Sequence, residues 1–188
     1  MLNNRTEPKK SALRETVEWI ITLAVAVGLA LAIHRWVGQL VIVEGESMEP
    51  TLHNEERVLL GKVEYRSTTP KRGDIVVVKY PGVKEDIIKR VVAVAGETIT
   101  VHDGNVYIDG TRLDEPYIME PIEDETEATK VPEGTIFVMG DNRNNSMDSR
   151  SGSVGPIALD QVLGRAYVVV WPVGNWEKLT GYTGGLVG

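Results

Sequence analysis

The sequence predicts a mainly β domain preceded by a single N-terminal helix. After residue 39, short runs rich in Val and Ile recur, and Gly, Pro, Asp or Asn separate many of them, as is typical of strands. Before that point, residues 19–33 form a fifteen-residue stretch without a charge. The 188 residues are 42% hydrophobic and 25% charged, which is an ordinary globular composition for one domain with an appendage.

The composition also excludes several functional classes. The chain has no Cys, so a disulfide scaffold, a thiol nucleophile and a cysteine-based metal site are all ruled out. Three scattered His residues make a dedicated histidine metal site unexpected, and no cofactor is predicted. The net charge of −7 argues against nucleic acid as a partner. Residues 1–38 carry +2 and residues 39–188 carry −9, which suggests two different environments.

The apolar N-terminal stretch is long enough to cross a membrane only if its polar ends are included. As a helix, residues 19–33 span roughly 22 Å, whereas residues 17–37 span roughly 31 Å, close to the hydrocarbon core of about 30 Å. Trp19 and Trp36 fall where interfacial aromatic residues are common. The four basic residues before residue 17 place the N-terminus in the cytoplasm by the positive-inside rule, so the rest of the chain lies outside.

Two other interpretations of this segment remain open on its sequence alone. Ala30-Leu31-Ala32 fits the small-x-small pattern of a cleaved secretory signal, and a buried core helix is equally apolar. With a retained anchor, four segments are expected: a cytoplasmic segment 1–16, an anchor 17–37, an extracytoplasmic β-rich domain 38–176 and a Gly-rich tail 177–188 that frays at its end.

Eight segments in the body of the chain have the length and composition of strands. They are residues 40–43, 57–60, 74–80, 87–94, 98–102, 106–108, 135–139 and 166–171. Asp103-Gly104 predicts a hairpin turn. Residues 156–163 are expected to form a short helix, and residues 114–133, with eight acidic residues and three prolines, a solvated loop. Coiled antiparallel sheets or a partly open barrel would protect the edges of so many short strands.

The first segment that could carry chemistry is residues 45–52. Ser47 follows a strand and precedes a turn containing Pro50, a junction that can hold a serine exposed at a cleft. A serine becomes a nucleophile only with a base. A serine at such a position also commonly caps or closes a turn, and the segment alone does not decide between the two.

The second segment, residues 86–97, contains Lys89 in an almost wholly apolar strand. Alternation puts Ile87, Lys89 and Val91 on one face and Ile88, Arg90 and Val92 on the other. If one face is buried, Lys89 or Arg90 is desolvated or paired. A buried Arg needs a carboxylate, whereas burial of a Lys lowers its pKa, and a useful base requires a shift of roughly 3 units, about 4 kcal/mol. A lysine on an edge strand facing water is the alternative.

The third segment, residues 140–150, follows a predicted strand. Its many polar groups of both charges indicate a compact, hydrogen-bonded loop, although an ordinary surface turn has a similar composition.

Together these segments resemble bacterial type I signal peptidases. The ordered set is Ser-Met-x-Pro-Thr-Leu at 47–52, Arg-Gly-Asp-Ile-Val-Val at 72–77, Lys-Arg-Val at 89–91 and Gly-Asp-Asn-Arg-x-x-Ser-x-Asp-Ser-Arg at 140–150. The resemblance covers about residues 43–172 and favours a retained anchor, as in the small single-anchor branch typical of Gram-positive bacteria. It implies a mainly β, signal peptidase-like fold with one transmembrane helix.

The resemblance also implies roles for individual residues. Ser47 would be the nucleophile of a serine endopeptidase, Lys89 its general base, and the Ser47 backbone N–H an oxyanion donor. Ser146 matches a serine that hydrogen-bonds and orients the lysine. Residues that match ion-paired supports of the site are Asp148, Arg150, Asp141 and Arg90. Residues that match the lining of shallow apolar subsites for Ala-x-Ala are Val43, Met48, Leu52, Ile87 and Ile88. The substrate would extend beside residues 41–44 and 86–88 by strand addition.

The implied setting is the outer face of the cytoplasmic membrane. Signal peptides of exported preproteins and the lipid bilayer would be partners, with the secretion translocon nearby. One departure bears on the chemistry, because Gly45 stands where some members carry a serine whose hydroxyl is a second oxyanion donor. A related Ser/Lys processing protease with another substrate, and an inactive membrane-tethered domain that only binds peptides, are the alternatives.

Overall fold

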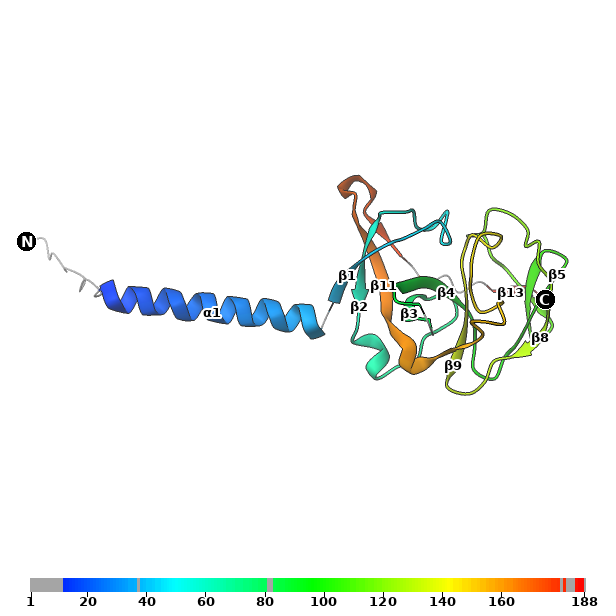
Figure 1. Ribbon diagram of the computed structural model, residues 1–188, viewed down its shortest axis with the longest axis horizontal. Helices are drawn as coiled ribbons and strands as arrows, with labels where there is room; N and C mark the ends of the chain where they lie inside the picture. Colours follow the sequence, from blue (N-terminus) through cyan, green and yellow to red (C-terminus); the bar gives the residue numbers. More distant parts are fainter. Residues whose placement is uncertain (1–11, 37, 81–82, 180, 182–184, 188) are drawn as a thin grey trace, which may run out of the picture. The chain divides into compact units, whose positions relative to one another are not determined.

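A computed structural model describes residues 12–36, 38–80, 83–179, 181 and 185–187. The chain divides between residues 37 and 38 into two units. The first contains the helix α1, Ala12–Trp36 (Figure 1).

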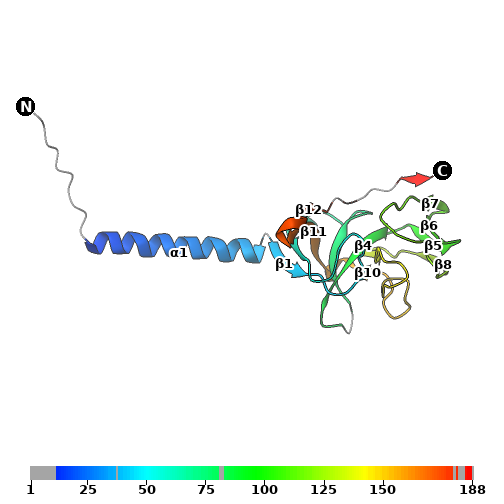
Figure 2. The same ribbon diagram turned by 90° about the horizontal axis from the view of Figure 1, so that it is seen from above.

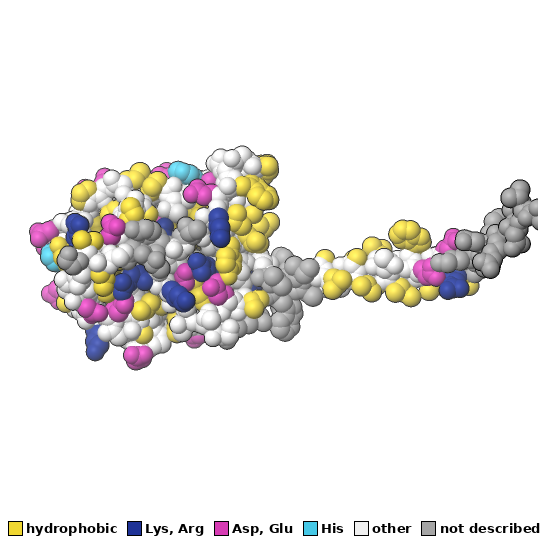
Figure 3. Space-filling model, turned by 180° about the vertical axis from the view of Figure 1, so that it is seen from behind, with side chains coloured by type: hydrophobic (Ala, Val, Ile, Leu, Met, Phe, Trp, Pro, Cys, Tyr) yellow, Lys and Arg dark blue, Asp and Glu magenta, His cyan; other side chains and the backbone are white. Residues whose placement is uncertain are grey.

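Hydrophobic side chains are exposed along the described length of α1, and charged ones gather at its N-terminal end (Figure 3). Within the described residues, no helix combines the length and the apolar character needed to cross a membrane. The predicted anchor, 17–37, extends over residues 31–37, whose side chains lie outside that described part.

The second unit is mainly β, as predicted. Its strands are β1 (Gly38–Ile42), β2 (Arg57–Gly61), β3 (Ile75–Lys79), β4 (Asp86–Val94), β5 (Thr98–His102), β6 (Asn105–Ile108), β7 (Thr111–Leu113), β8 (Thr126–Lys130), β9 (Thr135–Met139), β10 (Ile157–Ala158), β11 (Val162–Trp171), β12 (Glu177–Lys178) and β13 (Leu186–Val187). Three short 3₁₀ helices, η1 (Glu64–Arg66), η2 (Leu159–Gln161) and η3 (Val173–Asn175), connect them.

The strands form two antiparallel sheets. The larger sheet has the order β1-β2-β11-β3-β4-β9-β10, with β12 also paired to β11, and it curls into a half-barrel. The smaller sheet has the order β13-β7-β6-β5-β8 and lies beyond β4 and β9 (Figure 2). The predicted coiled antiparallel architecture is therefore confirmed.

The larger sheet is covered on both faces where β3 and β4 pair. Ile75, Val77 and Ile88 belong to one buried cluster. Val76, Val78 and Val91, which alternate with them, belong to another. Both faces of β4 are consequently buried from residue 88 to residue 93, and the neighbouring Lys89 and Arg90 are only 3% and 2% exposed. The sequence predicted that one of these two cations would be buried if one face of the strand was buried, and the fold buries both.

Three segments differ from the sequence prediction. The helix expected at 156–163 is present only as the short 3₁₀ helix η2 at 159–161, because residues 157 and 158 form β10, in which Ile157 pairs with Ile136 along the free edge of β9. The acidic segment 114–133 is not simply a solvated loop, since it contains β8, which pairs with β5. In the tail that was expected to fray, Leu186 pairs with Leu113 on β7. The Asp103-Gly104 hairpin is confirmed between β5 and β6.

Candidate active site

Ser47 lies in a tight turn that follows β1. The apolar residues Met48 and Leu52 of this turn are buried in the core, and the Leu52 N–H donates to the Met48 carbonyl oxygen at 2.9 Å. The left-handed conformation of Gly45, with a φ of 85°, starts the turn. The buried side chains of Met48 and Leu52 therefore attach the turn to the core and leave Ser47 at the edge of a cleft.

Lys89 on β4 reaches this serine directly. Its Nζ donates a hydrogen bond to Ser47 Oγ at 2.6 Å. Burial lowers the pKa of Lys89 to about 8, although the nearby carboxylates of Asp148 and Asp141 act in the opposite direction. A substantial fraction of Lys89 is therefore the neutral amine near pH 8, the form that accepts a proton. A hydroxyl and a lysine of lowered pKa in hydrogen-bond contact can act as nucleophile and base.

Arg90 points to the other face of β4 and binds Asp141 in a bidentate ion pair. The two contacts, from Nε and NH2, measure 2.8 and 2.6 Å, and both side chains are almost completely buried. Thr51 donates to the same carboxylate at 2.5 Å. The Arg90 guanidinium also lies 4.0 Å from the centre of the Tyr117 ring. This group ties β4 to the beginning of the 140–150 loop and to the turn that holds Ser47.

A second carboxylate, Asp148, organises the rest of the loop. Its two oxygens accept from Nε and NH2 of Arg150, each at 2.9 Å, and the Gly140 N–H donates to it at 3.1 Å. Arg150 also donates to the Arg143 carbonyl oxygen at 2.6 Å. The four predicted supports thus form two ion pairs, and both carboxylates lie near enough to Lys89 to raise its pKa.

Sequence reasoning missed a third ion pair. Arg143 is fully buried and binds both oxygens of Glu115, at 2.8 and 2.9 Å. Glu115 lies in the acidic segment that was assigned to solvent. The available signal was indirect, because a buried arginine requires a carboxylate but the sequence does not say which of eight acidic residues supplies it.

Ser146 does not make the contact that the resemblance implies. Its Oγ is buried and has no hydrogen-bond partner among the described residues, so it is not bonded to Lys89. Gly140 separates this serine from the Ser47 turn. A Cβ built at Gly140 would collide with both Ser146 Oγ and the Ser47 carbonyl oxygen. The close approach of the loop to the Ser47 turn therefore depends on the absence of a side chain at this position.

Two adjoining cavities open at the Ser47–Lys89 pair, with volumes of about 490 and about 80 Å³. Both are lined by Ser47, Lys89, Ile87 and Glu44. Val43, Met48 and Ile88 line the smaller one, among the residues predicted to contact substrate. The lining of the larger one also includes residues that the sequence reasoning did not select, namely Tyr80, Asn145 and Met147. Leu52 is buried beneath the turn and lines neither cavity.

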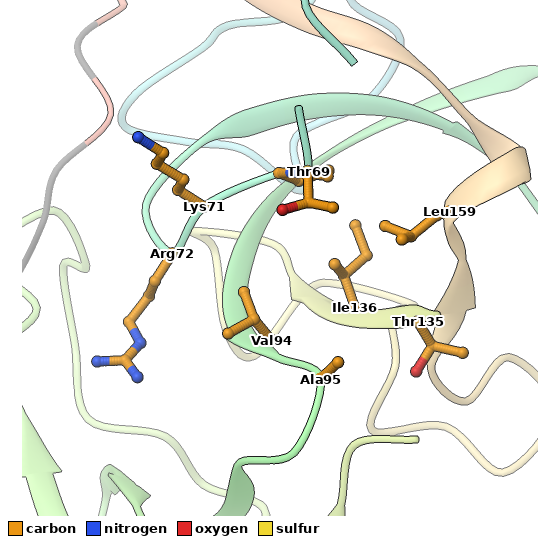
Figure 4. A pocket seen from close by; sticks show the side chains of 9 residues that line it. Thr69, Lys71, Arg72, Val94, Ala95, Thr135, Ile136 and Leu159 are labelled. Atoms are coloured by element: carbon orange, nitrogen blue, oxygen red, sulfur yellow. The ribbon is translucent and has the colours of Figure 1, made fainter. Parts of the chain in front are cut away.

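A separate cavity of about 360 Å³ lies between the ends of β4 and β9. Figure 4 shows Ile136 and Leu159 facing into it, with Lys71 and Arg72 at its margin. Neither Ser47 nor Lys89 is among its described lining residues. No group of His, Asp or Glu within the described part of the chain could hold a metal ion.

Comparison with known protein families shows which family the chain belongs to. The family model for signal peptidase, peptidase S26, matches residues 16–171, which include the Ser47 turn, β4 and the 140–150 loop. The chain belongs to this signal peptidase family. Members are serine endopeptidases of signal-peptide processing, so the chain is a protease of that class.

Similar proteins cover most of the chain. The signal peptidase I T of Bacillus subtilis is 38% identical over 186 residues, which are 92% of this chain and 96% of that protein. A probable signal peptidase I-2 of Synechocystis is 40% identical over 85% of this chain and 75% of its own length. A crystal structure of a signal peptidase I from Enterococcus faecalis is 31% identical, with a TM-score of 0.43 over 52% of this chain and 97% of that one.

Proposed function

We propose that the protein cleaves the signal peptides of exported preproteins after small residues, with Ser47 as the nucleophile and Lys89 as the general base. The observation that carries this proposal is the 2.6 Å hydrogen bond between Lys89 Nζ and Ser47 Oγ. The lowered pKa of Lys89, about 8, supports the role of base, because an ordinary lysine is almost entirely protonated at neutral pH.

In the proposed acylation step, Ser47 Oγ attacks the scissile carbonyl carbon while its proton passes to neutral Lys89. The carbonyl oxygen becomes an oxyanion that the Ser47 backbone N–H binds. The tetrahedral intermediate collapses, the peptide C–N bond breaks, and the ammonium of Lys89 returns the proton to the leaving amine. In deacylation, Lys89 takes a proton from water and the hydroxide attacks the acyl carbon. The ester bond to Ser47 Oγ then breaks, the carboxylic acid product leaves, and the ammonium of Lys89 returns the proton to Ser47 Oγ.

An unpaired stretch of β4 supports binding of the substrate as an added strand. On one side of β4, residues Asp86 to Ile88 pair with β3. On the other side, within the described strands, β9 pairs with β4 only from Arg90 onward. The backbone groups just before Lys89 are therefore available to an extended peptide. The cavity of about 80 Å³ beside Ser47 suits a side chain as small as that of alanine.

We also propose that residues 17–37 anchor the enzyme in the cytoplasmic membrane, with residues 1–16 inside and the β unit on the outer face near the translocon. The exposed apolar side chains of α1, such as Trp19, Ile20 and Leu23, support this proposal. An anchored enzyme meets membrane-held substrates in two dimensions.

The anchor is tested by extracting cell membranes with carbonate and then by measuring the accessibility of the β unit to protease in intact spheroplasts. Release of the full chain by carbonate, or protection of the β unit from protease, contradicts the anchor.

The catalytic assignment is tested with two pairs of matched variants of the full chain, assayed on a preprotein with an Ala-x-Ala site. Ser47→Ala and Lys89→Ala are expected to lose activity at least 10³-fold, on the order of that seen when one member of a catalytic pair is removed. Ser153→Ala and Lys130→Ala change the same residue types at exposed positions and should retain full activity. A cleaving Ser47→Ala variant contradicts the proposed nucleophile. Equal cleavage of a preprotein with Leu in place of both alanines contradicts the proposed specificity.

A further inference from the structure

The peptide group between Glu46 and Ser47 is held from one side by Asn142. The Asn142 side-chain Nδ2 donates to the Glu46 carbonyl oxygen at 3.2 Å. The backbone N–H of the same residue donates to the Ser47 carbonyl oxygen at 3.1 Å. One residue of the 140–150 loop thus binds two consecutive carbonyl groups, one on each side of the nucleophile's Cα.

The first of these carbonyls belongs to the same peptide group as the Ser47 N–H. This peptide bond is trans, so its C=O and N–H point in opposite directions. Fixing the direction of the Glu46 carbonyl therefore also fixes the direction of the Ser47 N–H. Among the described residues, this N–H has no hydrogen-bond acceptor, and both Glu46 and Ser47 line the cavity of about 490 Å³.

The orientation of this N–H matters in this chain because position 45 supplies no second donor. Position 45 is a glycine and has no hydroxyl. Its backbone N–H donates to Asn54 Oδ1 at 2.8 Å and is not available to a substrate. The Ser47 N–H is consequently the backbone donor of this turn that we expect to bind an oxyanion. A hydrogen bond to the carbonyl of a peptide group also polarises its N–H and strengthens the bond that the N–H donates.

We infer that Asn142 is a positioning residue for oxyanion stabilisation, acting through the carboxamide–Glu46 hydrogen bond that aims and polarises the Ser47 N–H. The inference rests on the proposed function, because it takes Ser47 as the nucleophile. No hydrogen bond joins Asn142 to Lys89 among the described residues, so Asn142 would leave the proton transfer unchanged. It therefore affects the transition state without changing the base or the binding of the ground state.

The test compares Asn142→Ala with Asn144→Ala in the full chain. Asn144 belongs to the same loop, but its side chain binds Glu120 and Pro121 rather than the Ser47 turn. For Asn142→Ala we expect kcat to fall about 10- to 100-fold, less than the 10²- to 10³-fold loss when an oxyanion donor is itself removed. KM should change less than about twofold, and the pH midpoint of kcat/KM should stay as in the wild type. Asn144→Ala should keep kcat within about threefold.

A pair of inhibitors separates oxyanion stabilisation from a general loss of structure. A peptide aldehyde forms a covalent hemiacetal with the serine hydroxyl and presents an oxygen to the oxyanion donor. The peptide alcohol of the same sequence binds without forming a covalent bond. Asn142→Ala should lower the affinity for the aldehyde by the same factor by which it lowers kcat/KM. The affinity for the alcohol should not change. Equal weakening of both inhibitors, a shifted pH midpoint, or an equal loss in Asn144→Ala overturns the inference.

Asn142→Asp provides a second variant if the alanine variant does not fold. It keeps the size of the side chain and the backbone N–H, replaces the Nδ2 donor with a carboxylate oxygen and adds a negative charge. A kcat within about threefold of the wild type in this folded variant overturns the inference. Ser47→Ala is assayed alongside it. If Ser47→Ala still cleaves, the proposed nucleophile is wrong, whereas an inactive Ser47→Ala with fully active Asn142 variants refutes the inference alone.

Discussion

Arg90 and Asp141 form a buried bidentate ion pair that joins the strand carrying Lys89 to the loop facing Ser47. The partners are 51 residues apart in the sequence, and their contacts measure 2.6 and 2.8 Å. A buried pair of this kind adds little net stability relative to apolar residues, but breaking it leaves a charge without compensation. At this site the pair connects β4, which carries Lys89, to the 140–150 loop.

Removal of the carboxylate from this pair should therefore be costly. Asp141→Ala strands the guanidinium of Arg90 in the core and should lower the free energy of unfolding by about 3–5 kcal/mol. Urea unfolding monitored by Trp fluorescence gives this value. Glu127→Ala, on an exposed position of β8, is the matched control and should change it by less than about 0.5 kcal/mol. A loss below about 1 kcal/mol for Asp141→Ala would mean that Arg90 finds another partner.

The rate of cleavage should rise with pH through the pKa of Lys89. With a folded pKa of about 8, roughly 1% of the amine is neutral at pH 6 and roughly 90% at pH 9. Because the neutral amine is the proposed base, kcat/KM should increase across this range with a midpoint near pH 8. Initial rates on a peptide substrate between pH 6 and 9 measure the profile. A flat profile would argue against a lysine base.

The burial of Lys89 should also cost stability at neutral pH. Its folded pKa lies below the unfolded value of 10.5, so the protonated form is disfavoured in the folded state. This penalty, up to about 3 kcal/mol, is complete below pH 8 and disappears as the pH rises to about 10.5. Lys89→Met should thus be inactive but more stable than the wild type at pH 7, with the difference narrowing above pH 8. Lys130→Met, at an exposed position, should show no such difference, and thermal melts at several pH values test the comparison.

Gly140 should tolerate no side chain. In Gly140→Ala, the new Cβ meets the Ser47 carbonyl oxygen and Ser146 Oγ, and the loop has to move away from the nucleophile. A displacement of about 1 Å at a catalytic group can cost on the order of 10²-fold in rate, and we expect a loss of that size in kcat. Gly152→Ala, in the same loop region but with open space around its Cβ position, should keep its activity. Equal activities of the two variants would show that the loop accommodates the methyl group elsewhere.

The sequence alone determined the type of fold and the candidates for the chemistry. Strand-length runs of Val and Ile predict β structure because such side chains pack well on a pleated surface, and most of these runs are strands. The ordered motifs around Ser47, Lys89 and residues 140–150 pointed to one family. The prediction was incomplete where a local pattern competes with a distant partner, as at 156–163, where pairing with β9 leaves only a short 3₁₀ helix at 159–161.

Only the tertiary structure decided which groups meet and what burial does to them. Alternation along β4 could assign one face to the core, but two layers of packing bury Lys89 and Arg90 together. In the sequence, Glu115 is one acidic residue among many. Its contact with Arg143 depends on the path of the loop through space. A pKa, an ion pair and an aimed N–H depend on atoms that are close in space and remote along the chain, and local sequence patterns do not encode those distances.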